Sequence, residues 1–351
     1  MLDNLGIDKA GKTRKRKKSA EDVPSAQSDA RLGQIIRVLT AYATVVVSGT
    51  KIASEIGTTR SEVWRLVQQL RQLGVDIAGH PATGYQLKSM PDLLLAEILG
   101  PMVQGTIFKN IHHYYKIGST NTAAMEAGDS GDPEGSVFVA EQQTAGRGRG
   151  ASVWHSARSA GIYCSVLLRP ALTPSDVLVL TLASGLAVHA AVKEIDPGVS
   201  LDLKWPNDVL IGGKKVCGIL TEMHAEVTRV KHIVVGIGLN VNQVSFPPDL
   251  ASIATSLRMA TGREWSRVEL CGALLKSLDR EYRGLIENSN ARDSVLKRFQ
   301  ERSSSARGRH IRVEENADLE GVTEGLDARG FLQVRTPQGL RTILSGTVVL
   351  R

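Results

Sequence analysis

The segment with the clearest chemical potential is residues 141–150, with the sequence Glu-Gln-Gln-Thr-Ala-Gly-Arg-Gly-Arg-Gly, followed by Trp154. A strand pattern ends where this segment begins, and its glycines let backbone N–H groups approach an anion closely. Arg147 and Arg149 add planar guanidinium groups that suit a phosphate or a carboxylate. The composition therefore predicts a loop that closes over an anionic ligand. The alternative is a disordered Arg-Gly segment that binds RNA nonspecifically, which a single Gly-Arg repeat between strand patterns disfavours.

Lys204 begins a second candidate segment, Lys-Trp-Pro-Asn-Asp, at residues 204–208. A lysine that ends a buried strand places its ammonium group at the rim of a sheet, where it can meet a carboxylate or an α-phosphate. The proline and the Asn-Asp pair are also typical of a plain structural turn, which is the alternative for this segment.

Two more segments offer polar groups to a small ligand. Ser119, Thr120 and Asn121 precede an alanine-rich helix. Ser or Thr is by default an N-cap there, although a helix N-terminus can also hold a polar ligand. In the run Gly-Ile-Gly-Leu-Asn, residues 236–240, two glycines remove side chains from a strand where another group packs closely. Asn240 offers a donor and an acceptor that suit an adenine edge.

These segments belong to a region of strand and helix patterns that runs from about residue 106 to residue 242. The extended apolar runs predict strands at 137–141, 162–168, 201–204, 209–211, 216–222 and 233–241. The apolar stripe of residues 176–195 predicts one long helix. Together they predict an α+β domain, a mixed sheet with helices on one face. Residues 266–302 predict two amphipathic helices, and the short extended runs after about Gly308 predict a small β barrel.

The N-terminal part predicts a winged helix-turn-helix. A helical pattern starts near Leu32, and a second short helix covers about 50–56. Thr59 and Glu62 have the spacing of a capping box at the start of a third helix, and two extended pieces around a turn at 80–84 form the wing. The face of the third helix opposite its apolar stripe would meet a DNA groove through Thr59, Arg60, Ser61, Arg65 and Gln68. Winged helices also serve as protein–protein modules, but the basic charge favours DNA.

The net charge of +7 is concentrated near the N-terminus. Residues 1–30 hold seven Lys or Arg and five Asp or Glu, a net +2, and residues 31–89 hold seven and three, a net +4. A basic module on a nearly neutral body predicts that a polyanion binds the module. We expect a disordered basic arm at 1–30, the winged helix at 31–89, a central domain at 90–305 and a C-terminal domain at 306–351. The arm is either a solvated tail or a nonspecific phosphate contact.

The composition is that of a multidomain globular protein. No apolar run approaches the roughly 20 residues that span a bilayer, and the N-terminus lacks the apolar core of a signal peptide. Cys164, Cys217 and Cys271 are scattered, which indicates reduced thiols rather than a disulfide framework. We therefore expect a cytoplasmic protein without membrane contact.

The order of these segments resembles that of biotin protein ligases. The matching runs are Ser-Thr-Asn at 119–121, Gln-Gln-x-Ala-Gly-Arg-Gly-Arg at 142–149, Lys-Trp-Pro-Asn-Asp at 204–208, Lys-x-x-Gly-Ile-Leu at 215–220 and Gly-x-Gly-Leu-Asn at 236–240. The tail from Gly325 resembles the C-terminal barrel of that family. The winged helix resembles the operator-binding domain of its bifunctional repressor members. The resemblance covers residues 31–351 and implies a class II synthetase-like sheet in the central domain.

The resemblance implies an ATP-dependent ligase that forms biotinyl-5′-AMP and passes biotin to a lysine of the biotin carboxyl carrier protein of acetyl-CoA carboxylase. It implies that biotin is bound by Ser119, Thr120, Asn121, Gln142, Arg147, Gly148, Arg149, Lys204 and Gly218. It implies that ATP or the adenylate is bound by Gly146, Arg149, Trp154, Lys204 and Asn240. Arg147, Arg149 and Lys204 would be catalytic. ATP brings Mg²⁺, for which the sequence identifies no protein ligand.

Bifunctional members of that family also repress biotin synthesis genes. The resemblance therefore implies operator DNA as a partner, with the adenylate as corepressor and a homodimer that the ligand promotes. Such coupling requires that the ligand stabilise the dimer differentially.

The chemistry of the residues agrees with adenylation. Joining a carboxylate to a phosphate requires positive charge and exclusion of water more than a protein nucleophile. No Ser–His or Cys–His pair in the sequence demands another mechanism, and we interpret His112, His113 and His155 as surface or packing residues. The run Gly-Ala-Ser-Val at 150–153 departs from the family pattern, which usually has an Arg or Lys before the tryptophan. This departure predicts weaker loop closure.

The sequence leaves three alternatives open. A lipoate-protein ligase shares the sheet and the adenylation chemistry, but it normally lacks a winged helix. A ligand-sensing repressor without ligase activity would not need Arg147, Arg149 and Lys204. A ligase whose winged helix is vestigial or only modulates turnover would have the same helix-turn-helix pattern.

Overall fold

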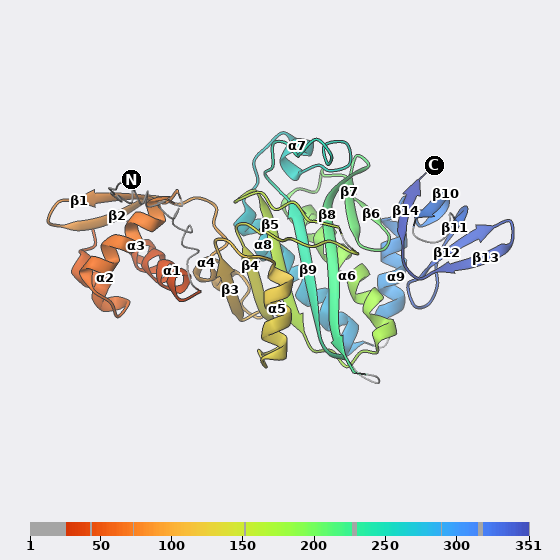
Figure 1. Cartoon of the computed structure of the whole chain (residues 1–351), viewed down its shortest axis with the longest axis horizontal. Helices are drawn as coiled ribbons and strands as arrows, with labels where there is room; N and C mark the ends of the chain where they lie inside the picture. The colour runs from red at the N-terminus through yellow and green to blue at the C-terminus, as the bar shows by residue number, and fades with distance from the viewer. Residues whose placement is uncertain are drawn as a thin grey trace, which may run out of the picture.

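The computed structural model describes residues 26–42, 44–72, 74–150, 152–226, 230–288, 290–314 and 319–350. Three units lie in a row along the long axis of the molecule (Figure 1). A helical N-terminal unit with a β wing borders one edge of a central sheet, and an all-β C-terminal unit borders the other.

The N-terminal unit is the winged helix-turn-helix that the sequence predicts. Its elements are α1 (Ala26–Ala41), α2 (Gly49–Glu55), α3 (Arg60–Gln72), β1 (Asp76–His80) and β2 (Gly84–Ser89). Ile35 and Leu39 of α1 and Leu66 and Leu70 of α3 are fully buried in one core, because apolar residues at helical spacing share a face. Of the predicted arm, residues 1–25 lie outside the described residues, and residues 26–30 belong to α1.

The central unit contains a seven-stranded mixed sheet in the order β3-β4-β5-β9-β8-β7-β6. The strands are β3 (Asn110–Tyr114), β4 (Ser136–Ala140), β5 (Gly161–Leu168), β6 (Asp202–Lys204), β7 (Asp208–Ile211), β8 (Lys214–Ala225) and β9 (Val230–Asn240). β3 is parallel to β4, and the other neighbours are antiparallel. The sequence predicts every strand of this sheet except β3.

Three long helices cover one face of the sheet and a shorter one covers the other. The first set is α6 (Val177–Ile195), α8 (Arg267–Glu287) and α9 (Ala291–Glu301), and the helix on the opposite face is α5 (Thr120–Asp129). Ile233, Val235 and Ile237 of β9 pack in the core of α6 and α8, whereas Val234 packs beneath α5. The prediction of helices on one face therefore fits the long helices and not α5. Shorter elements are α4 (Ala96–Met102), η1 (Pro174–Asp176) and α7 (Leu257–Thr261).

The α6 helix is long and apolar enough to cross a membrane by length and composition alone. The sequence predicts no such segment. In the structure 67% of its apolar stretch is buried, against the sheet and α8. Its apolar residues are those of a core helix.

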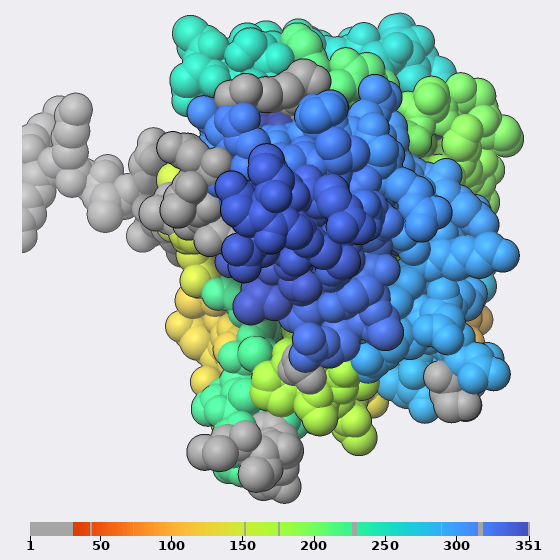
Figure 2. Space-filling model, turned by 90° about the vertical axis from the view of Figure 1, so that its right-hand side faces the viewer, coloured from red at the N-terminus to blue at the C-terminus, as the bar shows by residue number. Residues whose placement is uncertain are grey.

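The C-terminal unit is an antiparallel sheet in the order β13-β12-β11-β10-β14. Its strands are β10 (Arg307–Glu314), β11 (Leu319–Leu326), β12 (Leu332–Thr336), β13 (Gly339–Ile343) and β14 (Thr347–Leu350). Across the described part of this unit, the edge strands β13 and β14 do not pair, so hydrogen bonds do not close the predicted barrel. Figure 2 views the molecule from this end, where β11 contacts α9 of the central unit.

The linker between the N-terminal and central units, residues 90–95, packs against both units. Leu93 and Leu95 are buried in the N-terminal core, and Leu94 between them is buried in the central core. The backbone N–H of Arg267 donates to the Asp92 carboxylate, and the Arg267 guanidinium donates to the Asp92 carbonyl oxygen. The first turn of α8 therefore holds the linker in place.

Glu141 lies beside this linker with only 1% of its surface exposed. It accepts a hydrogen bond from the Leu94 N–H at 2.9 Å, and it pairs with Arg267 at 2.9 Å and with His113 at 3.3 Å. Burial would raise the pKa of Glu141, but the hydrogen bond with His113 and the charge of Arg267 outweigh it and lower the pKa to about 2. Glu141 stands five residues before the loop that contains Arg147, Arg149 and Trp154, called here the Gly-Arg loop (residues 146–150 and 152–155). One buried charge cluster therefore joins the segment that leads into this loop to the linker.

Candidate active site

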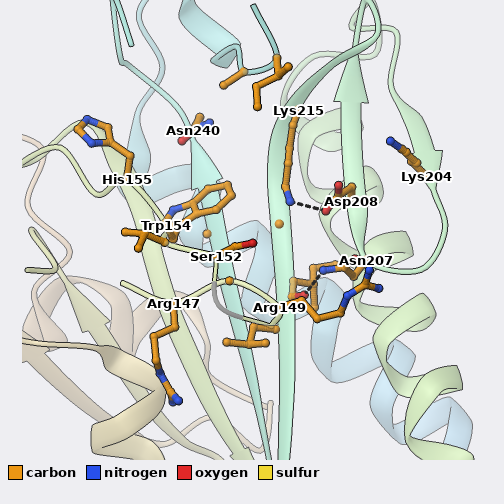
Figure 3. A pocket seen from close by; sticks show the side chains of 18 of the residues that line it. Arg147, Arg149, Ser152, Trp154, His155, Lys204, Asn207, Asp208, Lys215 and Asn240 are labelled. Carbon is orange, nitrogen blue, oxygen red and sulfur yellow. Dashed lines mark hydrogen bonds and ion pairs between the residues drawn. The ribbon is translucent and has the colours of Figure 1, made fainter. Parts of the chain in front are cut away.

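A cavity of about 640 Å³ lies on the α5 side of the central sheet (Figure 3). Its walls are the loop at 147–155, the first turn of α5, the turn between β6 and β7, the segment at 246–254, and Glu314 and residues 346–348 of the C-terminal unit. The even-numbered residues 236, 238 and 240 of β9 face this cavity, because successive side chains of a strand point to opposite faces.

The floor of the cavity is a network of polar side chains beneath α5. The Ser165 hydroxyl lies 2.8 Å from Thr120 Oγ1 and 2.6 Å from Asn121 Oδ1. Asn121 Nδ2 donates to Glu222 Oε2 at 2.9 Å, and Arg147 Nη2 donates to the same oxygen at 2.6 Å. Glu222 thus links the Gly-Arg loop to the start of α5, a connection that sequence reasoning missed.

Gln143, rather than the predicted Gln142, lines the cavity. Its Oε1 accepts from the Thr120 N–H at 2.9 Å, and its Nε2 donates to Ser156 Oγ at 2.9 Å. Gly146, also predicted as a site residue, does not line the cavity, and a Cβ there would lie 2.6 Å from the Trp154 carbonyl oxygen. The two glutamines are adjacent, so the motif alone could not indicate which one faces the site.

Two glycines of β9 leave room for other side chains, as the sequence predicts. A Cβ at Gly236 would lie 1.9 Å from Asn121 Oδ1, and a Cβ at Gly238 would lie 2.4 Å from the Trp154 ring. The Trp154 ring also lies over Gly218 of β8, where a Cβ would be 2.9 Å away. The indole therefore forms an aromatic wall above the polar floor.

Two lysines line the cavity, and they differ in their surroundings. Lys215 pairs with Asp208 at 2.5 Å, and its Nζ lies 5.5 Å from the Trp154 ring centroid. Figure 3 shows Lys215 beside Asp208, with Lys204 on the far side of that carboxylate. Lys204 ends β6 and has no ion pair within the described residues. The sequence motif Lys-x-x-Gly at 215–218 contains Lys215, but the sequence predicts Lys204 and Gly218, and not Lys215, as site residues.

Asn240 lines the cavity with its amide already engaged. Its Nδ2 donates to the Thr255 carbonyl oxygen at 3.1 Å, and its Oδ1 accepts from Gln243 Nε2 at 3.0 Å. These bonds hold the segment that follows β9, so part of the predicted capacity to bind an adenine edge is used within the chain.

The Gly-Arg loop folds back on itself as a tight hairpin. The Gly148 N–H donates to the Ser152 carbonyl oxygen at 2.8 Å, and the Trp154 N–H donates to that of Gly146 at 2.9 Å. Arg147, Gly148 and Arg149 all line the cavity. The other predicted residues that line it are Ser119, Thr120, Asn121, Trp154, Lys204, Gly218 and Asn240. Ala151, in the run that departs from the family pattern, lies outside the described residues.

The cavity therefore collects positive charge over a polar floor whose carboxylate, Glu222, is paired with Arg147. Four basic side chains from three segments line it: Arg147, Arg149, Lys204 and Lys215. Its lining carboxylates are Asp208 and Glu314. Such a site favours a ligand with a neutral polar head and an anionic end, and it can stabilise charge that develops between two joined anions.

The predicted DNA-binding face of α3 is exposed, but its members are not equivalent. Arg60 is exposed and has no ion pair among the described residues, whereas Arg65 donates to both carboxylate oxygens of Glu62 at 2.9 and 2.6 Å. The Thr59 hydroxyl accepts from the Glu62 N–H at 3.2 Å, which forms half of the predicted capping box. Ser61 is exposed and Gln68 is half-buried on the same helix.

Three family models match successive parts of the chain. The HTH domain matches residues 31–86, the Biotin/lipoate A/B protein ligase family matches residues 114–240, and the Biotin protein ligase C terminal domain matches residues 307–351.

Curated relatives and solved structures are similar over most of the chain. The bifunctional ligase/repressor BirA of Bacillus spizizenii is 36% identical over 87% of this chain and 94% of its own length. The biotin–[acetyl-CoA-carboxylase] ligase of Mycobacterium tuberculosis is 33% identical over 70% of this chain and 90% of its own. The biotin protein ligase of Aquifex aeolicus, solved in complex with biotin and ATP, has a TM-score of 0.60 and 32% identity, covering 70% of this chain and 99% of that chain.

Proposed function

Because the chain belongs to the biotin protein ligase family, we propose that it joins biotin to AMP and transfers the biotinyl group to a lysine of a carrier protein. The observation that carries this proposal is the cavity that Arg147, Arg149, Lys204 and Lys215 line together with the polar side chains at the start of α5. The carrier protein is that of acetyl-CoA carboxylase, the substrate in the name of the M. tuberculosis relative.

The β9 strand sets the order of the substrates along the cavity. From Gly236 at the floor to Asn240 at the far end, four residues of strand span roughly 13 Å. The biotin head occupies the floor, where Ser119, Thr120, Asn121 and Gln143 present donors and acceptors to a neutral ureido group. Gln143 has the biotin-binding role that the sequence predicts for Gln142. The mixed anhydride then lies beside Trp154, and the adenosine lies toward Asn240.

The cations act where the two anions meet. Lys215, held by Asp208 beside the indole wall, stabilises the charge that develops on the biotin carboxylate and the α-phosphate. Arg149 and Lys204 hold phosphate oxygens at the rim. As the loop closes, Arg147 leaves Glu222 and binds the ligand. Because Glu222 also accepts a hydrogen bond from Asn121 of the floor, loop closure and ligand binding at the floor depend on the same carboxylate.

Mg²⁺ accompanies ATP in this chemistry, but the lining residues form no dedicated site for it. Asp208 is paired with Lys215 at 2.5 Å and Glu314 with Arg312 at 3.2 Å, so both carboxylates of the described lining are taken by cations. A protein-bound Mg²⁺ requires carboxylate or carbonyl oxygens with near-octahedral geometry.

A direct test incubates the purified chain with biotin, Mg-ATP and a biotin carboxyl carrier domain, and measures the mass of the acceptor. We expect one added biotinyl group and none when the acceptor lysine is replaced. Lipoate in place of biotin separates the lipoate-ligase alternative. Absence of transfer from either acid, with no biotin-dependent release of pyrophosphate, would contradict the proposal and favour a ligand-sensing repressor.

Replacing Arg149 with glycine is expected to leave adenylate formation in place but to shorten the lifetime of bound biotinyl-5′-AMP by roughly 10- to 100-fold, since a hydrogen bond to a charged group contributes about 1.5–3 kcal/mol. A single-turnover chase with unlabelled biotin measures this lifetime. Arg158→Gly is the control, because Arg158 is exposed nearby but does not line the cavity. An unchanged lifetime in the Arg149 variant would contradict the role of that arginine.

The winged helix supports a second activity, repression of biotin synthesis genes from an operator, in a cytoplasmic protein. The adenylate is the corepressor, and it acts by favouring a homodimer in which two copies of α3 reach two half-sites. We expect biotin and ATP to shift the sedimentation of micromolar protein from monomer to dimer. ATP alone is the control. If biotin and ATP leave the sedimentation profile unshifted, the proposed ligand-dependent repression is contradicted, whereas the proposed ligase activity is not affected.

A further inference from the structure

A cluster of possible metal ligands lies away from the cavity, at the opposite end of α5. It consists of Asp129, the last residue of α5, with His224 of β8 and His232 of β9. The two histidines are directly paired across the antiparallel strands β8 and β9. Neither the ligase proposal nor the winged helix uses these residues.

The three ligand atoms already lie close together. All are within 4.8 Å of one another; Asp129 Oδ1 is 2.5 Å from His224 Nδ1 and 3.9 Å from His232 Nε2. Bonds of about 2.0–2.2 Å to a tetrahedral Zn²⁺ place two of its ligand atoms roughly 3.3 Å apart. The two Asp129 separations need shifts of less than 1 Å to reach this geometry, and the separation of the two imidazole nitrogens, at most 4.8 Å, needs a shift of up to about 1.5 Å. Asp129 and His224 can make them, because their side chains are 52% and 43% exposed.

His232 is the fixed member of the cluster and lacks the partner that burial demands. Its side chain is 1% exposed, and its Nε2 has no hydrogen-bond partner within the described residues. A buried, unpaired ring nitrogen costs free energy unless some group binds it. The position of the ring is specific, since a Cβ at Gly128 would lie 2.7 Å from it. The bare backbone at Gly128 thus admits an imidazole whose nitrogen faces Asp129.

The surrounding cations do not compete for these ligands. Arg169 donates to the carbonyl oxygens of Gly128, Asp132 and Lys231, and Lys231 pairs with Glu226 at 3.1 Å. Their positive charge weakens the attraction for a cation, but neither occupies His224 or His232.

We propose that Asp129, His224 and His232 form a binding site for a divalent transition-metal ion of the Zn²⁺ type, with water at the fourth position. Two imidazole nitrogens and one carboxylate oxygen are the ligands that such ions prefer, and Mg²⁺ or Ca²⁺ would require more oxygen ligands. The bound ion ties the C-terminus of α5 to the β8–β9 hairpin. These two elements also carry Asn121 and Glu222 of the cavity floor. The bound ion therefore stabilises the position of the floor of the biotin site, although the ion itself lies outside the cavity.

The test uses the full chain after chelator treatment and dialysis, titrated with ZnCl₂ in a calorimeter. We expect one equivalent to bind and a higher melting temperature with excess Zn²⁺, because a ligand of the folded state stabilises it. Asp129→Asn and His224→Gln replace exposed side chains with ones of similar size. Each should lower the affinity for Zn²⁺ by roughly 10- to 100-fold or more, because even loss of a residue that only supports a metal ligand lowers affinity by that factor. Neither variant removes the buried imidazole, so both should fold.

His112→Gln is the matched control. His112 forms another His–Asp pair, with Asp132 at 3.4 Å, but without a third ligand in the described residues. This variant should bind one equivalent of Zn²⁺ as the unmodified chain does. Failure of the unmodified chain to bind a stoichiometric ion, or binding that Asp129→Asn and His224→Gln leave unchanged, would overturn the proposal. Because the readout is metal binding and melting temperature, the result is independent of ligase activity.

Discussion

Lys215→Ala is expected to lower the rate of biotinyl-adenylate formation by about 10²- to 10³-fold, the usual effect of removing one preorganised donor from developing negative charge. Lys215 is the cation nearest the aromatic wall, at 5.5 Å from the Trp154 ring centroid, and Asp208 holds it there at 2.5 Å. Biotin-dependent release of pyrophosphate from ATP measures the step without a carrier protein.

Lys204→Ala is the comparison that decides between the two lysines. The family resemblance predicts a catalytic role for Lys204 together with Arg147 and Arg149, whereas the structure puts Lys204 on the far side of Asp208 from Lys215 (Figure 3). We expect Lys204→Ala to raise the KM for ATP more than it lowers kcat, because a rim residue binds substrate and transition state alike. A larger loss of kcat in Lys204→Ala than in Lys215→Ala would return the catalytic role to Lys204.

Arg267→Met is expected to destabilise the central unit by about 3–5 kcal/mol at pH 7, because it leaves the Glu141 carboxylate buried without its main countercharge. Both side chains are 1% exposed, and they lie 2.9 Å apart. Urea unfolding followed by tryptophan fluorescence measures the loss, and Trp265 lies two residues from the substitution. Arg335→Met is the control, since it breaks the exposed Arg335–Glu324 pair and should change stability little.

The effect of Arg267→Met should depend on pH in a defined direction. The folded-state pKa of Glu141, about 2, lies below its ordinary value of 4.5. A lowered carboxyl pKa contributes stability that is fully present above pH 4.5 and is lost as the pH falls through 2. The difference between the native chain and the variant should therefore shrink between pH 4.5 and pH 2. A difference that stays constant over that interval would mean that Glu141 is not the group responsible.

Local patterns in the sequence determined most of the elements. The helix predicted at 176–195 is α6 (Val177–Ile195), and the strand predicted at 162–168 is β5 (Gly161–Leu168). These assignments need only the periodicity of apolar residues and the residues that stop a helix or strand. The order of the polar runs likewise indicated the family before any geometry was known. β3 was missed because its sequence, Asn-Ile-His-His-Tyr, has little apolar alternation and pairs only with β4 at the sheet edge.

Which side chains meet in the cavity was decided by the tertiary structure. A strand places alternate residues on opposite faces, so a shift of one position exchanges the core side for the ligand side. That register depends on pairing between segments far apart in the chain, such as Ser165 of β5 with Gly236 of β9. The sequence could therefore not favour Gln143 over Gln142, or indicate that Glu222 would link Arg147 to Asn121. The loop, its arginines and the family were determined locally, whereas the choice of lysine, glutamine and linking carboxylate required the fold, because the contacts that select them are long-range.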